Sequence, residues 1–563
     1  MYATPSAVGI APLPFEEYLE GLSSIPLGII LPAVCEVQSV LHADGLNTDT
    51  QLALVAGLFG HTDAFAPLLN FVRGAPGERL AFCEQAMTLL QCLAILNCDE
   101  ELTGLSKKEY EGHVRGAILF APAYLEPRGT SPAEDRDGWL RLFTQLFDYS
   151  AKSVIGNAMA RTWTIFGRLH REASDILPSV PLDGWLTKDY GLGLEQQISL
   201  GFALFAQLGS HSENENEFSN SLSPESVASI FNSLGLTDEQ REAAEKLIAA
   251  PPSWFRHEFE AMDVEQLAWN RIPFMRRPFI RLPSGQYLLQ SPRALLNWIA
   301  DGIYYRCLDS AKKRDAVSEY TARIGKLTER YVLNLVSSAH KEPRLPGAGK
   351  VHGDKKFGPG LNSSDVTITY PNDVVLMEVA SHRLTAESLC DGDQAALERD
   401  LREMVGRRPK QLRRSIDAMK PRQPGRATTL RFDHLDPERI ARFWPLIITA
   451  TPLHWSPLLE EFMADPLTEL AGRRDVEALD VLAIEDLEAL VAITEETGRP
   501  LAQILAAKLE AAGPHADLRT WLSRDRRFPQ LSRPRYLDAA LDEAMDIASR
   551  LLGFPDLAED DVA

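Results

Sequence analysis

Apolar residues recur at three- and four-residue spacing along most of the first two hundred positions. The segments GERLAFCEQAMTLLQCLAIL (77–96) and GWLRLFTQLFDYSAKSVIGNAMARTWTIFGRL (138–169) show this spacing most clearly. Such spacing is typical of helices that bury one face against their neighbours. The sequence therefore predicts a large helical region from about residue 14 to residue 208, which offers packing rather than chemistry.

The pattern changes after a polar run at residues 210–226, which predicts a loop or linker. The stretch PFIRLPSGQYLLQSP (278–292) predicts two short strands around a Pro-Ser-Gly turn. Helical patterns stand on either side of it, in TDEQREAAEKLIAA (237–250) and RALLNWIADGIYYRCLDSA (293–311). We therefore expect a helical segment with one short β-hairpin between residues 225 and 314.

Strands and helices alternate from about residue 315 onward. An amphipathic helix is expected up to residue 340, and two strands are expected around the turn YPND (370–373). A long basic helix follows at 393–419, broken near Pro409. Two further strands are expected, in FWPLIITATPL (443–453) and ALDVLAIEDLEALV (478–491). The remaining tail has a helical and acidic pattern.

The composition is that of an ordinary soluble globular protein, with 45% hydrophobic and 24% charged residues. A chain of 563 residues is too long for one hydrophobic core, so about two to four domains are expected. The apolar stretch SIPLGIILPAVCEV (24–37) is short, contains two prolines and lacks a basic lead-in. It fits neither a signal peptide nor a membrane span, so we expect a cytoplasmic protein.

The six cysteines form no Cys-x-x-Cys pair, which argues against a structural zinc site or a disulfide framework. Reduced and mostly buried thiols are expected at Cys35, Cys83, Cys92, Cys98, Cys307 and Cys390.

The charge of the chain is unevenly distributed. The net charge of -21 disfavours non-specific binding of nucleic acid, which depends on neutralising phosphates with Lys and Arg. Residues 321–430, however, contain 19 basic and 13 acidic residues, whereas residues 456–563 contain 11 basic and 23 acidic residues. Any phosphate-binding face is therefore expected in the middle segment.

Two acidic residues lie in the strands that flank the YPND turn. Asp365 begins the first strand, and Glu378 interrupts the apolar run VVLMEVA of the second. Strand alternation places Glu378, Ala380 and, if the strand continues, His382 on one face. Because a lone buried acid is costly without a partner, we expect the two carboxylates to converge on Mg²⁺, which one or two acidic ligands can hold. The alternative for Asp365 is a cap at the strand entry.

The order of parts resembles the core of the PD-(D/E)xK nuclease superfamily, the restriction-endonuclease-like domain. Here a helix with Glu329 is followed by the strands with Asp365 and Glu378, and then by a helix with Gln411. The resemblance covers about a quarter of the chain, residues 315–453. It implies that Asp365 and Glu378 are metal ligands, that Glu329 is the additional acid of the first helix, and that Gln411 is the polar residue of the later helix. A solvated helix residue is the alternative for Glu329.

Ala380 departs from the superfamily pattern, because it stands where the motif has its lysine. A methyl group cannot orient the attacking water or offset charge on the phosphate. Replacements that the sequence leaves open are His382, Arg383, Lys355 and Lys356. His382 is alternatively a structural histidine at the strand end.

A basic cluster on the helix after the second strand is a candidate phosphate track. Its members are Arg402, Arg407, Arg408, Lys410, Arg413 and Arg414, followed by Lys420, Arg422 and Arg426. The alternative is an ordinary solvated helix face.

These patterns predict an α+β, mostly α protein in four regions. A helical N-terminal domain (1–209) precedes a helical segment with a short β-hairpin (225–314), a restriction-endonuclease-like α/β domain (315–455) and an acidic, mainly helical C-terminal region (456–563). The resemblance implies a Mg²⁺-dependent nuclease that binds or cleaves nucleic acid, in an architecture that suits bacterial defence against foreign DNA by analogy of fold. The alternative is a catalytically inactive scaffold or sensor, whose helical N-terminal and acidic C-terminal regions bind protein partners.

Overall fold

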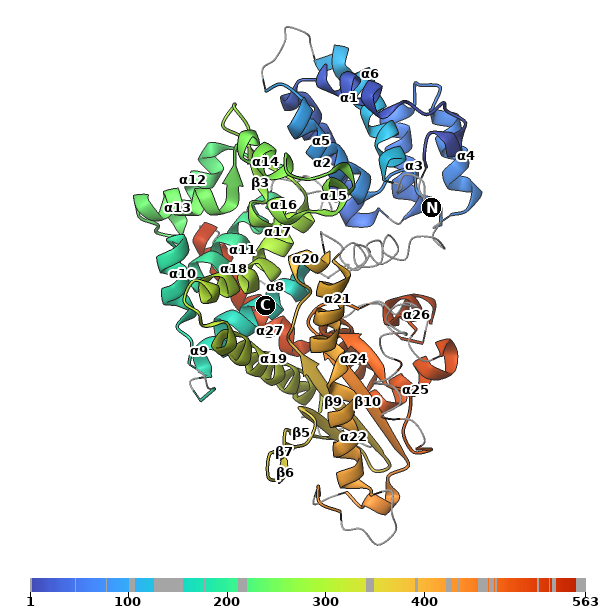
Figure 1. Cartoon of the computed structure of the whole chain (residues 1–563), viewed down its shortest axis with the longest axis vertical. Coiled ribbons are helices and arrows are strands. Elements are labelled where there is room, and N and C mark those ends of the chain that lie inside the picture. Colours follow the sequence, from blue (N-terminus) through green and yellow to red (C-terminus); the bar gives the residue numbers. More distant parts are fainter. Residues whose placement is uncertain are drawn as a thin grey trace, which may run out of the picture. The chain divides into compact units, whose positions relative to one another are not determined.

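Helices dominate the structure, a computed structural model, and the strands form small sheets (Figure 1). The structure describes residues 3–45, 47–76, 78–100, 107–125, 155–173, 175–176, 179–210, 220–340, 349–389, 393–421, 428–432, 435–453, 464, 470, 473–513, 516–525, 527–528 and 533–552. The expected α+β, mostly α class is confirmed. Parts of two predicted segments, the helical pattern at 138–154 and the linker at 211–219, lie outside the described residues.

The chain divides into two compact units that do not follow a single cut in the sequence. Unit 1 comprises residues 1–138, 182–306 and 545–563, and unit 2 comprises residues 139–181 and 307–544. Helices α18 (Asp301–Lys312) and α27 (Arg535–Leu552) each contain a boundary between the units. Unit 2 therefore joins the predicted nuclease-like segment to part of the acidic C-terminal region and to a short piece of the N-terminal half.

Unit 1 is built mainly of helices, and a large hydrophobic cluster joins residues of α1 to α6 with residues between 250 and 294. Its helices are α1 (Phe15–Ser23), α2 (Leu27–Asp44), α3 (Thr48–Phe59), α4 (Phe65–Gly74), α5 (Glu84–Asn97), α6 (Lys107–Phe120), α10 (Leu182–Tyr190), α11 (Leu194–Ser210), α12 (Pro224–Ser233), α13 (Asp238–Ile248), α14 (Pro252–Phe259), α15 (Val264–Trp269), α16 (Ile272–Arg276) and α17 (Pro292–Ile299), with the 3-10 turns η1 (Ser6–Val8) and η2 (Ala121–Tyr124). Residues 85–95 of α5 are all buried, as expected for a helix that is surrounded by others.

A small sheet in unit 1 contains the predicted hairpin. Strands β1 (Ser221–Leu222), β4 (Tyr287–Leu289), β3 (Phe279–Arg281) and β2 (Ala249–Ala250) lie side by side in that order. Strands β3 and β4 pair antiparallel, which confirms the hairpin. The turn between them requires Gly285, whose φ of +86° is unfavourable for a residue with a side chain.

The described cysteines, residues 35, 83, 92, 98 and 307, are buried free thiols, as expected, whereas Cys390 lies outside the described residues. Within the described ranges no single helix has the length and apolar character to cross a membrane. Helices at Phe15–Ser23 and Leu27–Ala43 meet these criteria only as a pair, across a bend of 114°.

Unit 2 combines helices with a five-stranded mixed sheet. Its helices are α8 (Ile155–Thr162), α9 (His170–Glu172), α19 (Val317–His340), α20 (Ala386–Leu389), α21 (Gln394–Leu401), α22 (Arg408–Met419), α24 (Ile484–Thr497), α25 (Leu501–Ala512) and α26 (Leu518–Arg524), with the π-helical segments η3 (Trp163–Leu169) and η4 (Arg402–Gly406) and the 3-10 turn η5 (Pro437–Arg439). Its strands are β5 (Lys350–Gly353), β6 (Lys356–Gly358), β7 (Leu361–Asn362), β8 (Val366–Thr369), β9 (Asp373–Ala380), β10 (Arg442–Thr449) and β11 (Asp480–Ala483).

The large sheet changes from antiparallel to parallel at β9, its central strand. The strand order is β11-β10-β9-β8-β5. Strands β5, β8 and β9 pair antiparallel, and β9, β10 and β11 pair parallel. The backbone N–H of Tyr370 donates to the carbonyl of Asp373 at 2.8 Å, which closes the predicted turn between β8 and β9.

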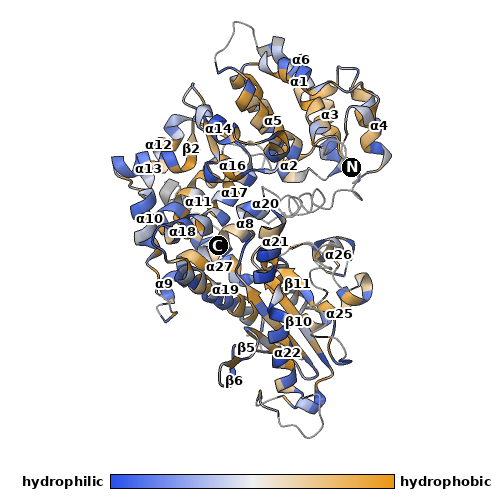
Figure 2. Cartoon of the chain, viewed as in Figure 1, coloured by the Kyte–Doolittle hydropathy of each residue, from blue (hydrophilic) through white to orange (hydrophobic). Residues whose placement is uncertain are grey.

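Strand β9 is buried on both faces, which explains its apolar sequence. Val374 and Leu376 pack in one cluster with Leu412 and Ile416 of α22 and with Ile447 of β10. Helix α22 lies over β9 and β10 in Figure 1, and Figure 2 shows the apolar character of β10 and β11.

The strand or strand-like run expected within 478–491 is confirmed only in its first part. Only β11 is extended, and helix α24 begins at Ile484. The carboxylate of Asp486 accepts a hydrogen bond from Ala483 N at 3.1 Å, which caps the first turn of this helix. The break near Pro409 is confirmed, because α21 and η4 end before α22 begins with proline in its first turn.

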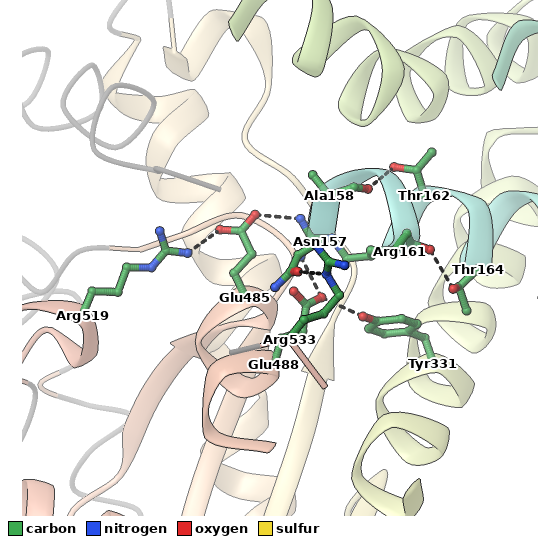
Figure 3. A network of polar contacts seen from close by, with 11 residues as sticks. Asn157, Ala158, Arg161, Thr162, Thr164, Tyr331, Glu485, Glu488, Arg519 and Arg533 are labelled. Atoms are coloured by element: carbon green, nitrogen blue, oxygen red, sulfur yellow. Dashed lines mark hydrogen bonds and ion pairs between the residues drawn. The ribbon is translucent and has the colours of Figure 1, made fainter. Parts of the chain in front are cut away.

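A buried polar network attaches α8 to the helices beside the sheet (Figure 3). Arg161 donates to Glu488 Oε1 at 2.8 Å and to Glu485 Oε1 at 2.7 Å, and the hydroxyl of Tyr331 donates to Glu488 Oε1 at 2.7 Å. Although burial opposes the charged form, Glu488 and Glu485 hold the pKa of Arg161 above its ordinary value. This network joins α8, α19 and α24 within unit 2.

Candidate functional site

The register of β8 and β9 brings Asp365 and Glu378 to one face of the sheet. Val366, the first residue of β8, lies opposite Met377, so Asp365 directly precedes the strand at the level of Glu378. The backbone N–H of Val379 donates to Asp365 Oδ2 at 2.8 Å and fixes this carboxylate beside β9. Burial raises the pKa of Asp365, and the hydrogen bond opposes that rise.

Glu378 is a buried acid with an unsatisfied oxygen. The residue is 3% exposed, and Oε1 has no hydrogen-bond partner among the described residues. Burial raises the pKa of Glu378 well above its ordinary value and the charge of Asp365 raises it further, whereas Arg408 opposes the rise. Because an unpartnered buried carboxylate is costly, this environment fits a group that binds a cation.

Helix α19 adds a third carboxylate and a cation. Lys326 and Glu329 are three residues apart and therefore share a helix face; Lys326 Nζ forms an ion pair with Glu329 Oε2. Burial and then the charge of Asp365 raise the pKa of Glu329 to about 7, against the effect of Lys326. The charge of Asp354 acts in the same direction. The pair on α19 thus lies within electrostatic reach of the strand acids.

Arg408, the first residue of α22, lies against the end of β9. Its Nη1 donates to the carbonyl of Glu403 at 2.8 Å and its Nη2 to the carbonyl of Val379 at 3.1 Å. Burial lowers the pKa of Arg408, while Glu378, and then Asp365, oppose this change. In the described part of the protein its Nε is buried without a hydrogen-bond partner.

Gln411 of α22 lies near the start of β8. Its Nε2 donates to the carbonyl of Ser363 at 3.5 Å, at the outer limit of a hydrogen bond. Ser363 is fully buried, and its hydroxyl accepts a hydrogen bond from Lys355 N at 2.8 Å. Gln411 therefore contacts the segment that leads into Asp365.

The residues that sequence analysis offered in place of the motif lysine are engaged elsewhere or exposed. Strand β9 ends at Ala380, so the alternation does not reach His382; its Nε2 lies 2.9 Å from Asp400 Oδ1. Desolvation lowers the pKa of Arg383 to about 9, and the charges that act on it are those of Arg161 and Glu485.

Lys355 and Lys356 lie in the segment before β8. Lys355 Nζ donates to the carbonyl of Arg431 at 2.6 Å and lies 5.3 Å from the centre of the Phe432 ring. Lys356 is exposed on β6. The two cations whose charges act most strongly on Glu378 are instead Arg408 and Lys326.

The predicted phosphate track divides into an inward and an outward part. Arg408 is partly buried and lies within electrostatic reach of Glu378 and Asp365, whereas Arg407, Lys410 and Arg414 are exposed. Arg413 pairs with Asp417 of the same helix at 3.6 Å. The structure further shows Lys420 paired with Asp475 at 3.5 Å, while Arg422 and Arg426 lie outside the described residues.

Lys326 and Asp354 were not among the site residues predicted from the sequence. Arg408 was predicted as a member of the basic cluster, but not as the member that lies near the acids. The signal for Lys326 was its spacing of three from Glu329, which predicts a shared helix face. No comparable signal existed for Arg408, because every residue of the basic cluster has the same charge.

The acids form an incomplete ligand set rather than a closed cage. No three His, Cys, Asp or Glu side chains of the described residues are arranged to hold a metal ion by themselves. Two neighbouring carboxylates, one of them with an unsatisfied oxygen, nevertheless fit Mg²⁺, which retains waters and takes few protein ligands. Fold and site together define an α+β protein with an acidic site where its mixed sheet changes direction.

No family model matches the chain, and neither a curated protein nor a solved structure matches it.

Proposed function

We propose that the protein is a divalent-metal-dependent nuclease, with Asp365 and Glu378 as its metal ligands. One observation carries this proposal: Glu378 is buried on the sheet opposite Asp365, and its Oε1 has no hydrogen-bond partner among the described residues. Most buried polar side-chain atoms have a hydrogen-bond partner, so a free oxygen beside a second carboxylate supports a cation-binding role.

The order and pairing of elements support the same proposal. Helix α19 precedes the antiparallel strands β5, β8 and β9, and α21 and α22 then lead to the parallel strand β10. This succession is the one that the resemblance to the PD-(D/E)xK superfamily implies. Glu329, Glu378 and Gln411 lie in α19, β9 and α22, and Asp365 directly precedes β8.

The chain's own residues would bind and orient the reactants. Val379 N–H holds Asp365 in place, and Glu378 offers the free oxygen. A bound Mg²⁺ supplies activation of water and stabilisation of charge on the phosphate. The net reaction adds water across a phosphodiester bond: the water oxygen bonds to phosphorus, the bond to the leaving oxygen breaks, and the products are a phosphomonoester and an alcohol.

The exposed cations of α22 and the segment before it suit a polyanionic substrate. Arg407, Lys410 and Arg414 lie on the same short segment as Arg408 and are exposed. Such residues contact phosphates without reading sequence, and they position a nucleic acid relative to a site. Nucleic acid is therefore the proposed substrate.

The second candidate function is an inactive nuclease-like scaffold, and Ala380 is the observation that favours it. This residue is fully buried and contributes only a methyl group. A scaffold of this kind would bind metal or nucleic acid without cleaving it.

The test is metal-dependent cleavage of plasmid, linear duplex and single-stranded DNA and of RNA by the full chain with Mg²⁺ or Mn²⁺. We expect cleavage that Glu378→Gln reduces at least about 10²-fold, the usual cost of losing one positioned group. The matched control is Asp373→Asn, which changes the acid at the other end of β9, an ion-pair partner of Arg442. Metal binding without cleavage would favour the scaffold, and absence of both would refute the metal site.

A further inference from the structure

We propose that Arg408 and Lys326 together supply the positive charge that the methyl group of Ala380 cannot supply. Arg408 binds the scissile phosphate, and Lys326 orients the attacking water. The inference rests on the proposed function, because both roles require a phosphodiester bound beside Asp365 and Glu378.

Arg408 lies next to position 380, and helix α19, which carries Lys326, passes close to the same end of β9. Arg408 Nη2 donates to the carbonyl of Val379, the residue before Ala380. On the other side, α19 passes so close to the end of β9 that a Cβ added to Gly325 would lie 3.5 Å from Ser381 Oγ. Lys326 is the next residue of α19. The two elements that carry these cations therefore meet the end of β9, where a motif lysine would stand.

The surroundings of Arg408 fit a phosphate-binding group. Two of its nitrogens are fixed by the backbone carbonyls of Glu403 and Val379, so its planar guanidinium is held in one orientation. Its buried Nε has no partner in the described part of the chain, just as Glu378 Oε1 has none. An unused donor and an unused acceptor of this kind fit a substrate phosphate and a metal ion, respectively.

The π-helical segment η4 lies directly before Arg407 and Arg408 and contacts Arg408. Segments of this type are wider than an α-helix and often lie at functional sites. Residues 402–406 form η4, and the carbonyl of Glu403 within it receives Arg408 Nη1. Arg407, one residue earlier, is exposed, with its side chain 80% accessible. Consecutive helical residues point about 100° apart, so Arg407 is exposed while Arg408 lies against Val379.

Lys326 fits a different role, because it is reachable from solvent. Its side chain is 49% exposed and its ammonium pairs with Glu329. Burial opposes the charged form, but Glu329, followed by Asp365 and Asp354, raises the pKa of Lys326. A cation that stays protonated beside the acids and faces solvent can donate a hydrogen bond to an incoming water.

The atoms and protons of the hydrolytic step are accounted for without a change in the protonation of either cation. The water oxygen forms its bond to phosphorus as the bond to the leaving oxygen breaks. The water proton passes to solvent, and the leaving oxygen takes up a proton from solvent. Arg408 and Lys326 donate hydrogen bonds throughout and transfer no proton.

The experiment measures kcat, KM and Mn²⁺ affinity for the full chain with a linear duplex. Arg408→Ala and Lys326→Met are each expected to lower kcat about 10²-fold, as loss of a charge-stabilising donor does. Mn²⁺ affinity should stay the same or increase, because a neighbouring positive charge has been removed. Arg408→Lys and Lys326→Arg should each recover part of the lost kcat.

Matched controls are a neighbouring cation for each position. Arg399→Ala removes an exposed cation of α21 and Arg330→Met removes the partner of Asp175 on α19; each should leave kcat within about threefold, since neither belongs to the proposed phosphate track or to the acidic site. Arg408→Gln keeps amide N–H donors for the carbonyls, so it tests the role of the charge if Arg408→Ala does not fold.

Unchanged kcat in Lys326→Met and Arg408→Gln, with cleavage lost in Glu378→Gln, would overturn the inference and leave the proposed function standing. Weakened Mn²⁺ binding and a lowered melting temperature in parallel with kcat would assign both cations a structural role. Absence of cleavage by the unaltered chain would overturn the proposed function and this inference together.

Discussion

Glu378 has a carboxyl group whose ionisation is opposed by burial and by the charge of Asp365. A carboxyl whose pKa is raised in the folded state binds its proton more tightly when folded than when unfolded. Its contribution to stability is therefore complete below the ordinary carboxyl pKa and is lost as pH rises through the folded pKa. The pKa of Glu329 is raised to about 7, so this residue changes stability with pH in the same direction as Glu378.

The metal-free protein should consequently lose stability as pH rises from about 5 to about 8, the range between ordinary and raised carboxyl pKa values. Glu378→Gln should remove part of this loss of stability. It should raise the melting temperature at about pH 8 by several degrees, since a change of about 1 kcal/mol in the free energy of unfolding shifts the melting temperature by a few degrees. Thermal melts in a chelator would measure this effect. The control Glu438→Gln, at an exposed residue of η5, should follow the unaltered protein. Equal pH slopes in Glu378→Gln and the unaltered protein would contradict the prediction.

Elements of unit 2 are joined by polar contacts as well as by apolar packing. Helix α8 comes from residues far from the sheet in sequence, yet Arg161 is held by Glu485 and Glu488 of α24 (Figure 3). Glu488 is fully buried and also accepts a hydrogen bond from Tyr331 of α19. Removing one partner from a buried ion pair leaves an uncompensated buried charge. The resulting loss of stability is larger than the net stabilisation that the intact pair contributed.

Arg161→Ala is therefore expected to destabilise unit 2 by about 3–5 kcal/mol. Adding Glu488→Gln should restore part of this loss, because it removes a charge left unpaired. The midpoint of chemical unfolding of unit 2, followed by a probe within it, is the measurement. Arg330→Ala is the control, since its partner Asp175 is exposed and such pairs contribute about 1 kcal/mol or less. Equal effects of the two arginine changes would refute this account.

Element boundaries were predictable where local pattern and turn chemistry agree. The turn at 370–373 has Pro, Asn and Asp between two apolar runs, and β8 and β9 flank it as expected. The stretch 478–491 was less clear, because a short apolar run is compatible with strand or helix. There the helix-capping carboxylate of Asp486 determines that α24 begins after β11.

For the whole molecule, the net charge of -21 opposes binding of nucleic acid, whereas residues 321–430 are locally basic. Affinity should therefore depend on a few positioned cations rather than on the average charge. Removing one cation that neutralises a phosphate reduces the slope of log affinity against log salt by about one.

The double change Arg407→Gln and Arg414→Gln should weaken binding of a labelled duplex and lower this salt slope by about two. Fluorescence anisotropy in Ca²⁺, from about 50 to about 200 mM salt, would show the change. Arg115→Gln with Lys246→Gln is the control, because it removes the same charge from unit 1. An unchanged slope in the first variant, or an equal change in the control, would exclude the proposed track.

The sequence by itself determined the mostly helical class, the strands around the acidic pair and the candidates Asp365 and Glu378. These features follow from local periodicity, turn residues and the cost of an acid in an apolar strand, all of which act over a few positions. Only the tertiary structure decided that Arg408 contacts the end of β9 beside Ala380, that helix α19 with Lys326 passes the same strand end, and that residues 155–173 belong with the sheet. These neighbours come from elements that are distant in sequence. Their positions depend on how the elements pack and on the local winding of segments such as η4. Residue type alone specifies neither.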